Sequence, residues 1–444
     1  MSNATGEPFK GHGGWFSSVL FVVVFYYFWI GLAPFPNPND DGLLTAYGNA
    51  SNLVNQLIVV AMSFLVLATL LQHPERQLVL RSYGPLVIIF LWLLFTALFS
   101  DAPAIALRRI VFAALVCLCA SAVLLLPRSS AHFAKLIGLC LLFAVSLSLF
   151  GVFALPHRAI HQATDALEQS LAGDWRGHLG HKNVAAAAMV YAVFFGLYIA
   201  KRRSFRLGAP IVLFAATFLL NSGGKTSAAM LPATLVACWL FERCGPFRLL
   251  LLVGGLGASN AILLSAAVSP SIQNFLTSMG VDPTFTDRTS IWELALSAIA
   301  NRPFTGYGFQ SFWQTDALVY SGQSIGTWAV SAANAHNGYL DQVINGGLPL
   351  LLLMLVWLVF LPCYHAGLAL KRQHDPELTR LFIRVWLFSL FTSCLENIFF
   401  DNSGPIWFTM LISVFGLRLQ AYAYLTKAPS LGTIKRAPLN LATT

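Results

Sequence analysis

The chain has 444 residues, of which 57% are hydrophobic and only 10% are Asp, Glu, Lys or Arg. This composition excludes an ordinary water-soluble enzyme and indicates a protein that crosses a membrane many times. The formal net charge of +9 does not indicate nucleic-acid binding, because membrane topology accounts for most of the cations.

Apolar runs of about the length needed to cross a bilayer follow one another along the whole chain. They begin near Gly14, Ser51, Gly84, Ala106, His132, Asn183, Phe205, Thr226, Phe247, Gly347, Leu381 and Pro405. Most links between them are short, so the sequence predicts an all-α polytopic membrane protein of about 12 transmembrane helices in one domain, residues 1–444. Residues 269–345 form a long loop between predicted spans 9 and 10, with an amphipathic helical pattern near residues 288–300. Its apolar stripe consists of Ile291, Leu294, Leu296 and Ile299.

The cations divide by side of the membrane. Of the 27 Lys and Arg, 19 fall on the face shared by both termini, which the positive-inside rule assigns to the cytoplasm. The other eight lie on the outer face: Arg108, Arg109, Arg158, Arg176, Lys182, Lys225, Arg288 and Arg302. Cations against a bilayer are costly and usually face a cavity and a counter-ion. The sequence therefore predicts an outer cavity for a polyanion, although ordinary solvated loop charge fits Arg158 and Arg302 equally well.

The first polar outer segment is Asp174–Asn183, which leads into an Ala-rich span. Asn183 is placed to cap the following helix, and Lys182 would lie at that helix's N-terminus, where an anion is favoured. His178 and His181 raise the alternative of a metal site, but no further ligands at suitable spacing accompany them. Loop packing or carbohydrate contact fits these histidines better.

Two further outer segments carry polar residues. The turn Asn221–Ser227 places Lys225 at a helix start, where an anion contact and a simple capped polar turn are equally good interpretations. The long loop contains Arg288 before a helix and His336 just before a span, among Asn334, Asn337, Tyr339 and Asp341. A histidine in such surroundings is a candidate general base, and the competing interpretation is a structural histidine that holds the loop.

Together these segments resemble a known superfamily. The motifs are Gly180-His-Lys-Asn183, Arg288 followed by Trp292, Pro303-Phe-Thr-Gly306-Tyr-Gly308 and His336-Asn337-Gly-Tyr339. In order, spacing and outer-face placement they are similar to the O-antigen ligases and Wzy-type polysaccharide polymerases. The His-Lys-Asn segment and the Lys225 turn are most similar to the exopolysaccharide polymerase-like branch.

The resemblance implies a GT-C-type glycosyltransferase in the bacterial inner membrane, with its active site facing the periplasm. It implies an undecaprenyl-pyrophosphate-linked glycan donor, an acceptor sugar hydroxyl and no metal or other cofactor. We expect His336 to act as base and Arg288 to stabilise the pyrophosphate, in a metal-independent inverting transfer. Substrate binding is expected of a wider set: Lys182, Asn183, Lys225, Arg176, Asn337, Tyr339, Arg108 and Arg109. A chain-length regulator is a possible partner.

Three alternatives remain open from the sequence. An O-antigen ligase, which transfers the glycan to lipid A-core, needs the same donor site and base as a polymerase. An exporter or flippase of a lipid-linked or anionic substrate also needs cations that face a cavity, and Glu396, with Asp401 near the end of the same span, supports it. A structural subunit of an envelope assembly is the weakest interpretation.

Overall fold

The computed structural model describes residues 14–37, 53–165, 169–319, 328–402 and 404–422. Within these ranges the regular structure is helical, apart from an isolated bridge between Ile160 and Trp175. The prediction of an all-α fold is thus confirmed. The terminal cations used for the topology, Lys10, Lys427, Lys435 and Arg436, lie outside the described residues.

Long helices account for most of the described chain, and a helix lies at each of the predicted apolar runs. The long helices are α1 (Trp15–Trp29), α2 (Leu53–Gln72), α4 (Tyr83–Ala97), α5 (Pro103–Ala122), α6 (Ser130–Ala154), α8 (Lys182–Arg202), α9 (Phe205–Asn221), α10 (Lys225–Arg243), α11 (Arg248–Val268), α15 (Gly338–Leu355), α16 (Leu361–Arg372), α17 (Pro376–Thr392) and α18 (Pro405–Tyr422). The shorter ones are α3 (Arg76–Leu80), α7 (Pro156–Ala159), α12 (Pro270–Ser278), α13 (Arg288–Asn301) and α14 (Asp316–Val319).

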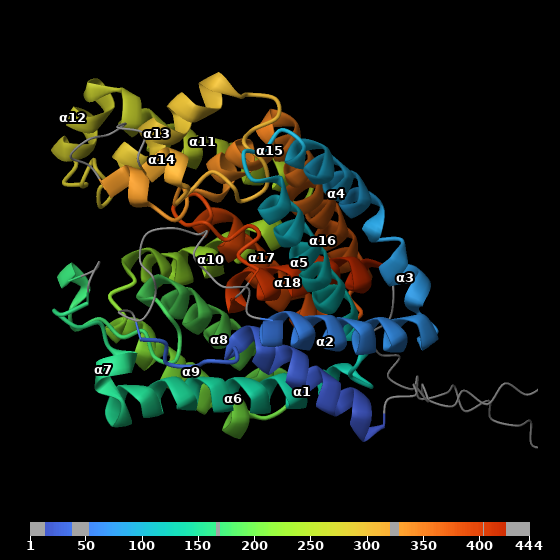
Figure 1. Ribbon diagram of the computed structural model, residues 1–444. Helices are drawn as coiled ribbons and strands as arrows, with labels where there is room; N and C mark the ends of the chain where they lie inside the picture. Colours follow the sequence, from blue (N-terminus) through green and yellow to red (C-terminus); the bar gives the residue numbers. More distant parts are fainter. Residues whose placement is uncertain (1–13, 38–52, 166–168, 320–327, 403, 423–444) are drawn as a thin grey trace, which may run out of the picture.

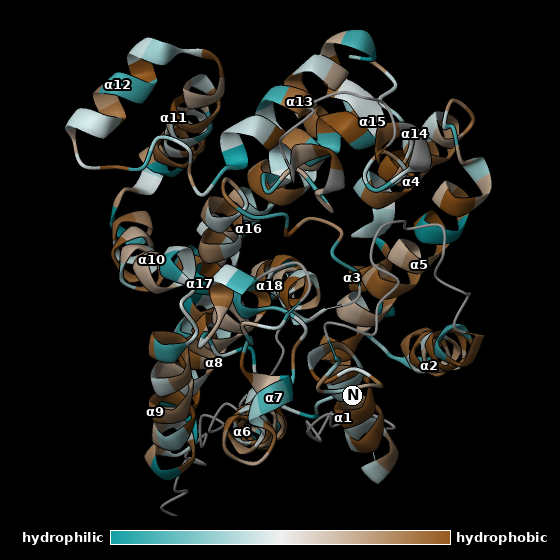
Figure 2. Ribbon diagram, turned by 60° about the vertical axis from the view of Figure 1, so that its left-hand side comes forward, coloured by the Kyte–Doolittle hydropathy of each residue, from teal (hydrophilic) through white to brown (hydrophobic). Residues whose placement is uncertain are grey.

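Six described segments are long and apolar enough to cross a membrane, judged by length and composition. They are Leu53–Gln72, Pro103–Leu125, Ser130–Ala154, Lys182–Arg202, Gly245–Val268 and Gly338–Arg372. The apolar helices α1, α4 and α9 are shorter. Hydrophobic residues dominate the long helices in Figure 2, whereas hydrophilic residues appear on the short helices α7, α12 and α13. The chain is therefore a multi-helix membrane protein, and the count of twelve spans stays a prediction.

Helix α8 lies at the centre of the bundle and packs against α6, α9, α10, α17 and α18. Its first turns are small buried residues, Ala185–Ala188. It contacts α9 backbone to backbone: a Cβ added to Gly208 of α9 would lie 2.4 Å from the backbone nitrogen of Ala200. Small residues allow such close approach of helices in a membrane.

The two ends of α8 define two ends of the molecule. At its C-terminal end, Lys201 pairs with Glu377 at 2.7 Å and Arg202 with Asp375 at 3.4 Å, both at the start of α17. Its N-terminal end lies beside the segment that follows α17. Figure 1 shows α7, α12, α13 and α14 toward the left and α3 toward the right, consistent with this polarity. The start of α8 and the segment that follows α17 therefore lie together at one end of the bundle.

The Pro303–Gly308 motif packs closely against a break inside α15. Gly347 has a φ of 72°, which L side chains rarely adopt, and a Cβ there would lie 2.1 Å from the Phe304 carbonyl oxygen. Gly306 approaches the chain equally closely, because its Cβ would lie 2.3 Å from the Ile344 carbonyl oxygen. Helix α15 begins at Gly338, and the break at Gly346 and Gly347 divides it into two helical pieces. The second piece begins next to Gly347, where the sequence predicts the tenth span.

The expected amphipathic helix of the long loop is α13. Ile291, Trp292 and Leu294 are buried against the rest of the protein. Leu296 and Ile299, which were expected on one apolar stripe with Ile291 and Leu294, are half-buried. Helix α13 packs against α11 and α15, so the loop is folded onto the outer end of the bundle.

Candidate functional site

Four segments distant in the sequence meet around the carboxylate of Glu396. Arg288 at the start of α13 lies 2.7 Å from Glu396 Oε1 through Nη2. His336, in the turn before α15, has Nδ1 3.6 Å from Glu396 Oε2. Asn183 at the start of α8 donates from Nδ2 to Glu396 Oε1 at 3.2 Å. We call Asn183, Arg288, His336 and Glu396 the outer cluster.

Backbone hydrogen bonds bring Glu396 to His336. The Gly338 N–H donates to the Ser393 carbonyl at 2.7 Å, just beyond the C-terminal end of α17. Asn337, which is fully buried, donates from Nδ2 to the Cys394 carbonyl at 3.0 Å. The Asn337 side chain also accepts from the N–H groups of Tyr339 and Leu340, capping α15. The turn that carries His336 is thus fastened to the segment that carries Glu396.

The His336 turn is held in a strained form. His336 has a φ of 46°, in the left-handed region that a residue with a Cβ seldom occupies. The buried Asp341 accepts the Ala335 N–H at 3.1 Å and the Trp313 indole N–H at 2.8 Å. The Trp292 indole donates to the Ala335 carbonyl at 2.9 Å, which connects α13 to the turn. Strain of this kind persists where surrounding contacts enforce it, commonly at functional sites.

Arg288 follows an unusual stretch of backbone. Phe285, Thr286 and Asp287 all have positive φ, between 49° and 63°, and they direct the chain into α13. The Arg288 side chain is 13% exposed, and Glu396 holds its guanidinium through Nη2. A planar guanidinium held at one nitrogen keeps further N–H donors for an incoming oxyanion.

The electrostatics of the outer cluster favour an ionised Glu396. Burial by itself raises the pKa of this carboxyl, but Arg288 and His336 outweigh burial and lower the pKa to about 2. The carboxylate therefore carries its charge throughout the neutral range. It lies where it orients both the cation and the imidazole.

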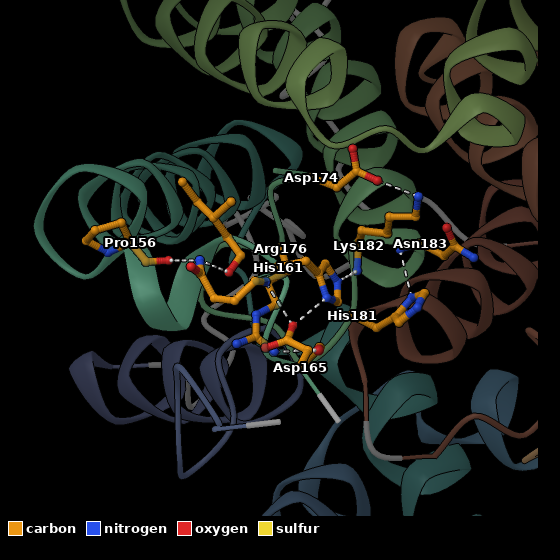
Figure 3. Close-up of polar contacts among 11 residues, drawn as sticks. Pro156, His161, Asp165, Asp174, Arg176, His181, Lys182 and Asn183 are labelled. Atoms are coloured by element: carbon orange, nitrogen blue, oxygen red, sulfur yellow. Dashed lines mark hydrogen bonds and ion pairs between the residues drawn. The ribbon is translucent and has the colours of Figure 1, made fainter. Parts of the chain in front are cut away.

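A second group of charges adjoins the outer cluster at the start of α8 (Figure 3). Lys182 Nζ lies 2.5 Å from Asp174 Oδ2. The Lys182 backbone N–H donates to His161 Nε2 at 3.4 Å, and His161 Nδ1 faces Asp165 at 3.2 Å. The prediction that Asn183 caps this helix was wrong. His181 is the cap, because its Nδ1 accepts the Asn183 N–H at 3.1 Å, and the Asn183 side chain is left to reach Glu396.

The Lys225 turn packs against this group. A Cβ on Gly223 would lie 2.3 Å from Asp174 Oδ1, and the Trp175 N–H donates to the Asn221 carbonyl at 3.1 Å. Lys225 is exposed at the first residue of α10. The turn, Asp174, Lys182 and the outer cluster are consecutive neighbours at this end of the protein.

The remaining predicted site residues lie elsewhere or deeper. Arg176 is fully buried and donates to the Gly180 carbonyl at 3.5 Å. Arg109 donates to the Gln310 carbonyl, and Arg108 is exposed on α5. The Tyr339 hydroxyl donates to the Leu390 carbonyl at 2.9 Å within the packing.

The histidines considered for a metal have other partners. His178 is buried, with Nδ1 2.7 Å from the Ser148 hydroxyl and Nε2 2.8 Å from the Trp29 carbonyl. In the part of the chain that the structure describes, no three His, Cys, Asp or Glu side chains gather as a potential metal site. Both ring nitrogens of His178 are thus engaged in contacts inside the protein, as in a structural histidine.

Sequence reasoning did not place Glu396 with Arg288 and His336. It noted the residue as an acidic group near a span and associated it with the exporter alternative. A lone acid close to the end of an apolar run was the available signal, because such a group needs a partner. The partner is 108 residues away in the sequence, and only the contact of the first residue of α13 with the segment that follows α17 identifies it.

Two similarities to known proteins concern the region that carries most of these residues. Residues 180–355 match the family described as O-antigen ligase. The matched region includes Asn183, Arg288 and His336 and ends before Glu396. The chain is also 24% identical over 211 residues to the exopolysaccharide production protein ExoQ of Rhizobium meliloti (strain 1021). That match covers 44% of this chain and 47% of the relative, about half of its length. The two matches confirm the resemblance to the O-antigen ligase and Wzy-type polysaccharide polymerase superfamily.

Proposed function

We propose that the protein is a membrane glycosyltransferase that transfers a glycan from a polyprenyl-pyrophosphate donor to a sugar hydroxyl. The observation that carries the proposal is the outer cluster, in which one carboxylate holds an arginine and a histidine side by side. A transfer of this kind needs a fixed cation for the departing pyrophosphate and a base for the attacking hydroxyl. The similarity to an O-antigen ligase family and to ExoQ supports it.

The proposed chemistry assigns one task to each residue. Arg288 binds the phosphate oxygens with the N–H groups that Glu396 does not occupy, and it stabilises the charge released as the sugar–phosphate bond breaks. His336 directs Nδ1 toward Glu396, so Nε2 takes the proton of the acceptor hydroxyl as that oxygen attacks the anomeric carbon. A single displacement inverts the anomeric centre. Lys182 and Lys225 extend the positive surface for the rest of the anionic donor.

Polymerisation of repeat units is the preferred form of this reaction. The name of the relative, an exopolysaccharide production protein, supports it. The family description, O-antigen ligase, favours transfer to lipid A-core as the second candidate. The exporter alternative loses support, because Glu396 lies beyond the last residue of α17 and pairs with Arg288 there. A site facing the periplasm of the inner membrane follows from the cation distribution and belongs to the proposal.

A reconstituted reaction tests the proposal. Purified protein receives a lipid-linked repeat unit as donor, with either a second lipid-linked unit or lipid A-core as acceptor. We expect polymer with the first acceptor and no product with the second. His336→Gln, which keeps a hydrogen-bonding side chain of similar reach, is expected to lose on the order of a hundredfold in rate. Arg158→Ala removes an exposed arginine of the same face and serves as the control.

Each outcome has a definite meaning. Near-normal turnover by His336→Gln would refute the base assignment. Product on lipid A-core alone would identify a ligase. Loss of activity in EDTA would contradict a metal-independent transfer, and transport of the donor without any new glycosidic bond would establish an exporter.

A further inference from the structure

A cavity lies at the opposite end of the molecule from the outer cluster. It has a volume of about 750 Å³ and opens between the C-terminal ends of α10 and α16 and the N-terminal ends of α11 and α17. These are the ends that carry the excess of Lys and Arg, on the face that the positive-inside rule assigns to the cytoplasm. The proposed glycosyl transfer does not use this cavity.

The lining of the cavity has an excess of positive charge. Arg380 is compensated, because its Nε donates to both Glu242 oxygens, at 2.8 and 3.0 Å, and its Nη1 to Glu377 at 2.8 Å. Arg248 and Lys371 also line the cavity, and among the described residues neither has a carboxylate partner. The balance of the wall is therefore cationic.

Arg248 is fixed in position by the backbone. Its Nε donates to the Phe241 carbonyl at 2.7 Å and its Nη2 to the Glu242 carbonyl at 3.0 Å. Its Nη1 lies toward Gly367, 3.4 Å from where a Cβ on that glycine would be. A guanidinium held in this way has lost its conformational freedom beforehand, which favours binding of an anion at Nη1.

One side of the cavity is apolar and outward-facing. Leu249, Phe360 and Tyr364 line it, and their side chains are 39%, 40% and 61% exposed. Phe360 belongs to the candidate membrane span Gly338–Arg372. A small soluble anion gains nothing from contact with these apolar residues. A lipid, in contrast, places its acyl chains against apolar residues and its phosphate beside cations.

We propose that this cavity binds an anionic phospholipid of the cytoplasmic leaflet. Arg248 and Lys371 contact its phosphate, and Leu249, Phe360 and Tyr364 contact the upper part of its acyl chains. Basic pockets between the cytoplasmic ends of helices commonly hold such headgroups. The ligand would connect α10 and α11 to α16 and α17 at the end remote from the outer cluster.

Two variants and a matched control test the site by native mass spectrometry. The full-length protein in detergent is titrated with phosphatidylglycerol, phosphatidylcholine or inorganic phosphate. Lys371→Gln removes a lining cation, and Gly367→Leu fills the cavity from α16 while keeping every charge. Arg372→Gln removes the next cation of the same helix, which does not line the cavity. Lys371 and Arg372 are neighbours on the last, exposed turn of α16, so the two charge removals are comparable.

We expect selective retention of phosphatidylglycerol by the wild-type protein and by Arg372→Gln. A lysine near an anionic lipid surface contributes about 1 kcal/mol, so Lys371→Gln should weaken binding about fivefold, and Gly367→Leu should abolish it. Equal retention of phosphatidylcholine would overturn the proposal, since the cavity would then be recognising acyl chains alone. Equal weakening by Lys371→Gln and Arg372→Gln would also overturn it, as would displacement of the lipid by millimolar inorganic phosphate.

Discussion

Replacement of Glu396 by Gln isolates the charge at the centre of the outer cluster. Gln has the same size, and its side-chain oxygen still accepts from Asn183 and Arg288 at the positions that Glu396 Oε1 now serves. The charge that faces His336 Nδ1 at 3.6 Å is lost. The variant therefore separates electrostatics from packing.

The expected size of the effect follows from the position of the carboxylate. Its pKa is lowered from 4.5 to about 2, although burial acts in the opposite direction. A shift of that size corresponds to roughly 3 kcal/mol in favour of the ionised form in the folded protein. The side chain is 19% exposed, so solvent screens the pair only in part. We expect Glu396→Gln to lower stability by about 2–3 kcal/mol at neutral pH.

The stability difference should depend on pH with a definite sign. A depressed pKa means that the carboxylate stabilises the folded state above pH 4.5, and that this stabilisation is lost as the pH falls toward about 2. Thermal unfolding in detergent, followed from pH 7 to pH 3, should show the difference between wild type and Glu396→Gln narrowing steadily below pH 4.5. Glu293→Gln, an exposed substitution on α13, should follow the wild-type curve throughout.

Steady-state kinetics distinguish orientation of the base from binding of the donor. Without the carboxylate, His336 loses its orienting partner, and we expect kcat to fall about 10- to 100-fold. Arg288 keeps its hydrogen bond to the Gln oxygen while the site loses a negative charge, so KM for the pyrophosphate donor should stay the same or decrease. A stable variant with unchanged kcat would refute the role given to Glu396. A raised KM with normal kcat would show that Glu396 acts through Arg288 instead.

Three further predictions concern other parts of the protein. Arg288→Lys should remain at least tenfold slower than wild type in the donor assay, even if it is faster than Arg288→Ala, because two-point phosphate contact needs the planar guanidinium. A wild-type rate in Arg288→Lys would show that charge alone suffices. Gly347→Ala should destabilise the protein by about 2–4 kcal/mol in a detergent melt, because a side chain has no room at this positive φ. Gly254→Ala, where an added Cβ meets nothing within 4 Å, is its control, and equal melting of the two would contradict the account of the α15 break. Reporter fusions at Arg203 and Asp174 should report cytoplasm and periplasm respectively, and reversal of either would break the predicted topology.

The sequence by itself determined the features that depend on local pattern. Runs of apolar residues mark the membrane helices, because a spanning segment in lipid must satisfy its own backbone hydrogen bonds. The amphipathic pattern around Ile291 and Leu294 identified α13. The motifs around Asn183, Arg288 and His336 indicated the superfamily, because their order and spacing along residues 180–355 can be read directly from the sequence.

Tertiary structure decided what joins those motifs. In the sequence Glu396 is an isolated acidic residue. Its contacts with Arg288 and His336 arise only when the start of α13 and the turn before α15 meet the segment that follows α17. The cap of α8 was likewise misassigned, since Asn and His both supply an acceptor and only the folded loop shows that His181 supplies it. Periodicity records which face of a helix is buried. It carries no information about which distant segment covers that face, and the pairing of charges across the bundle depends on that choice.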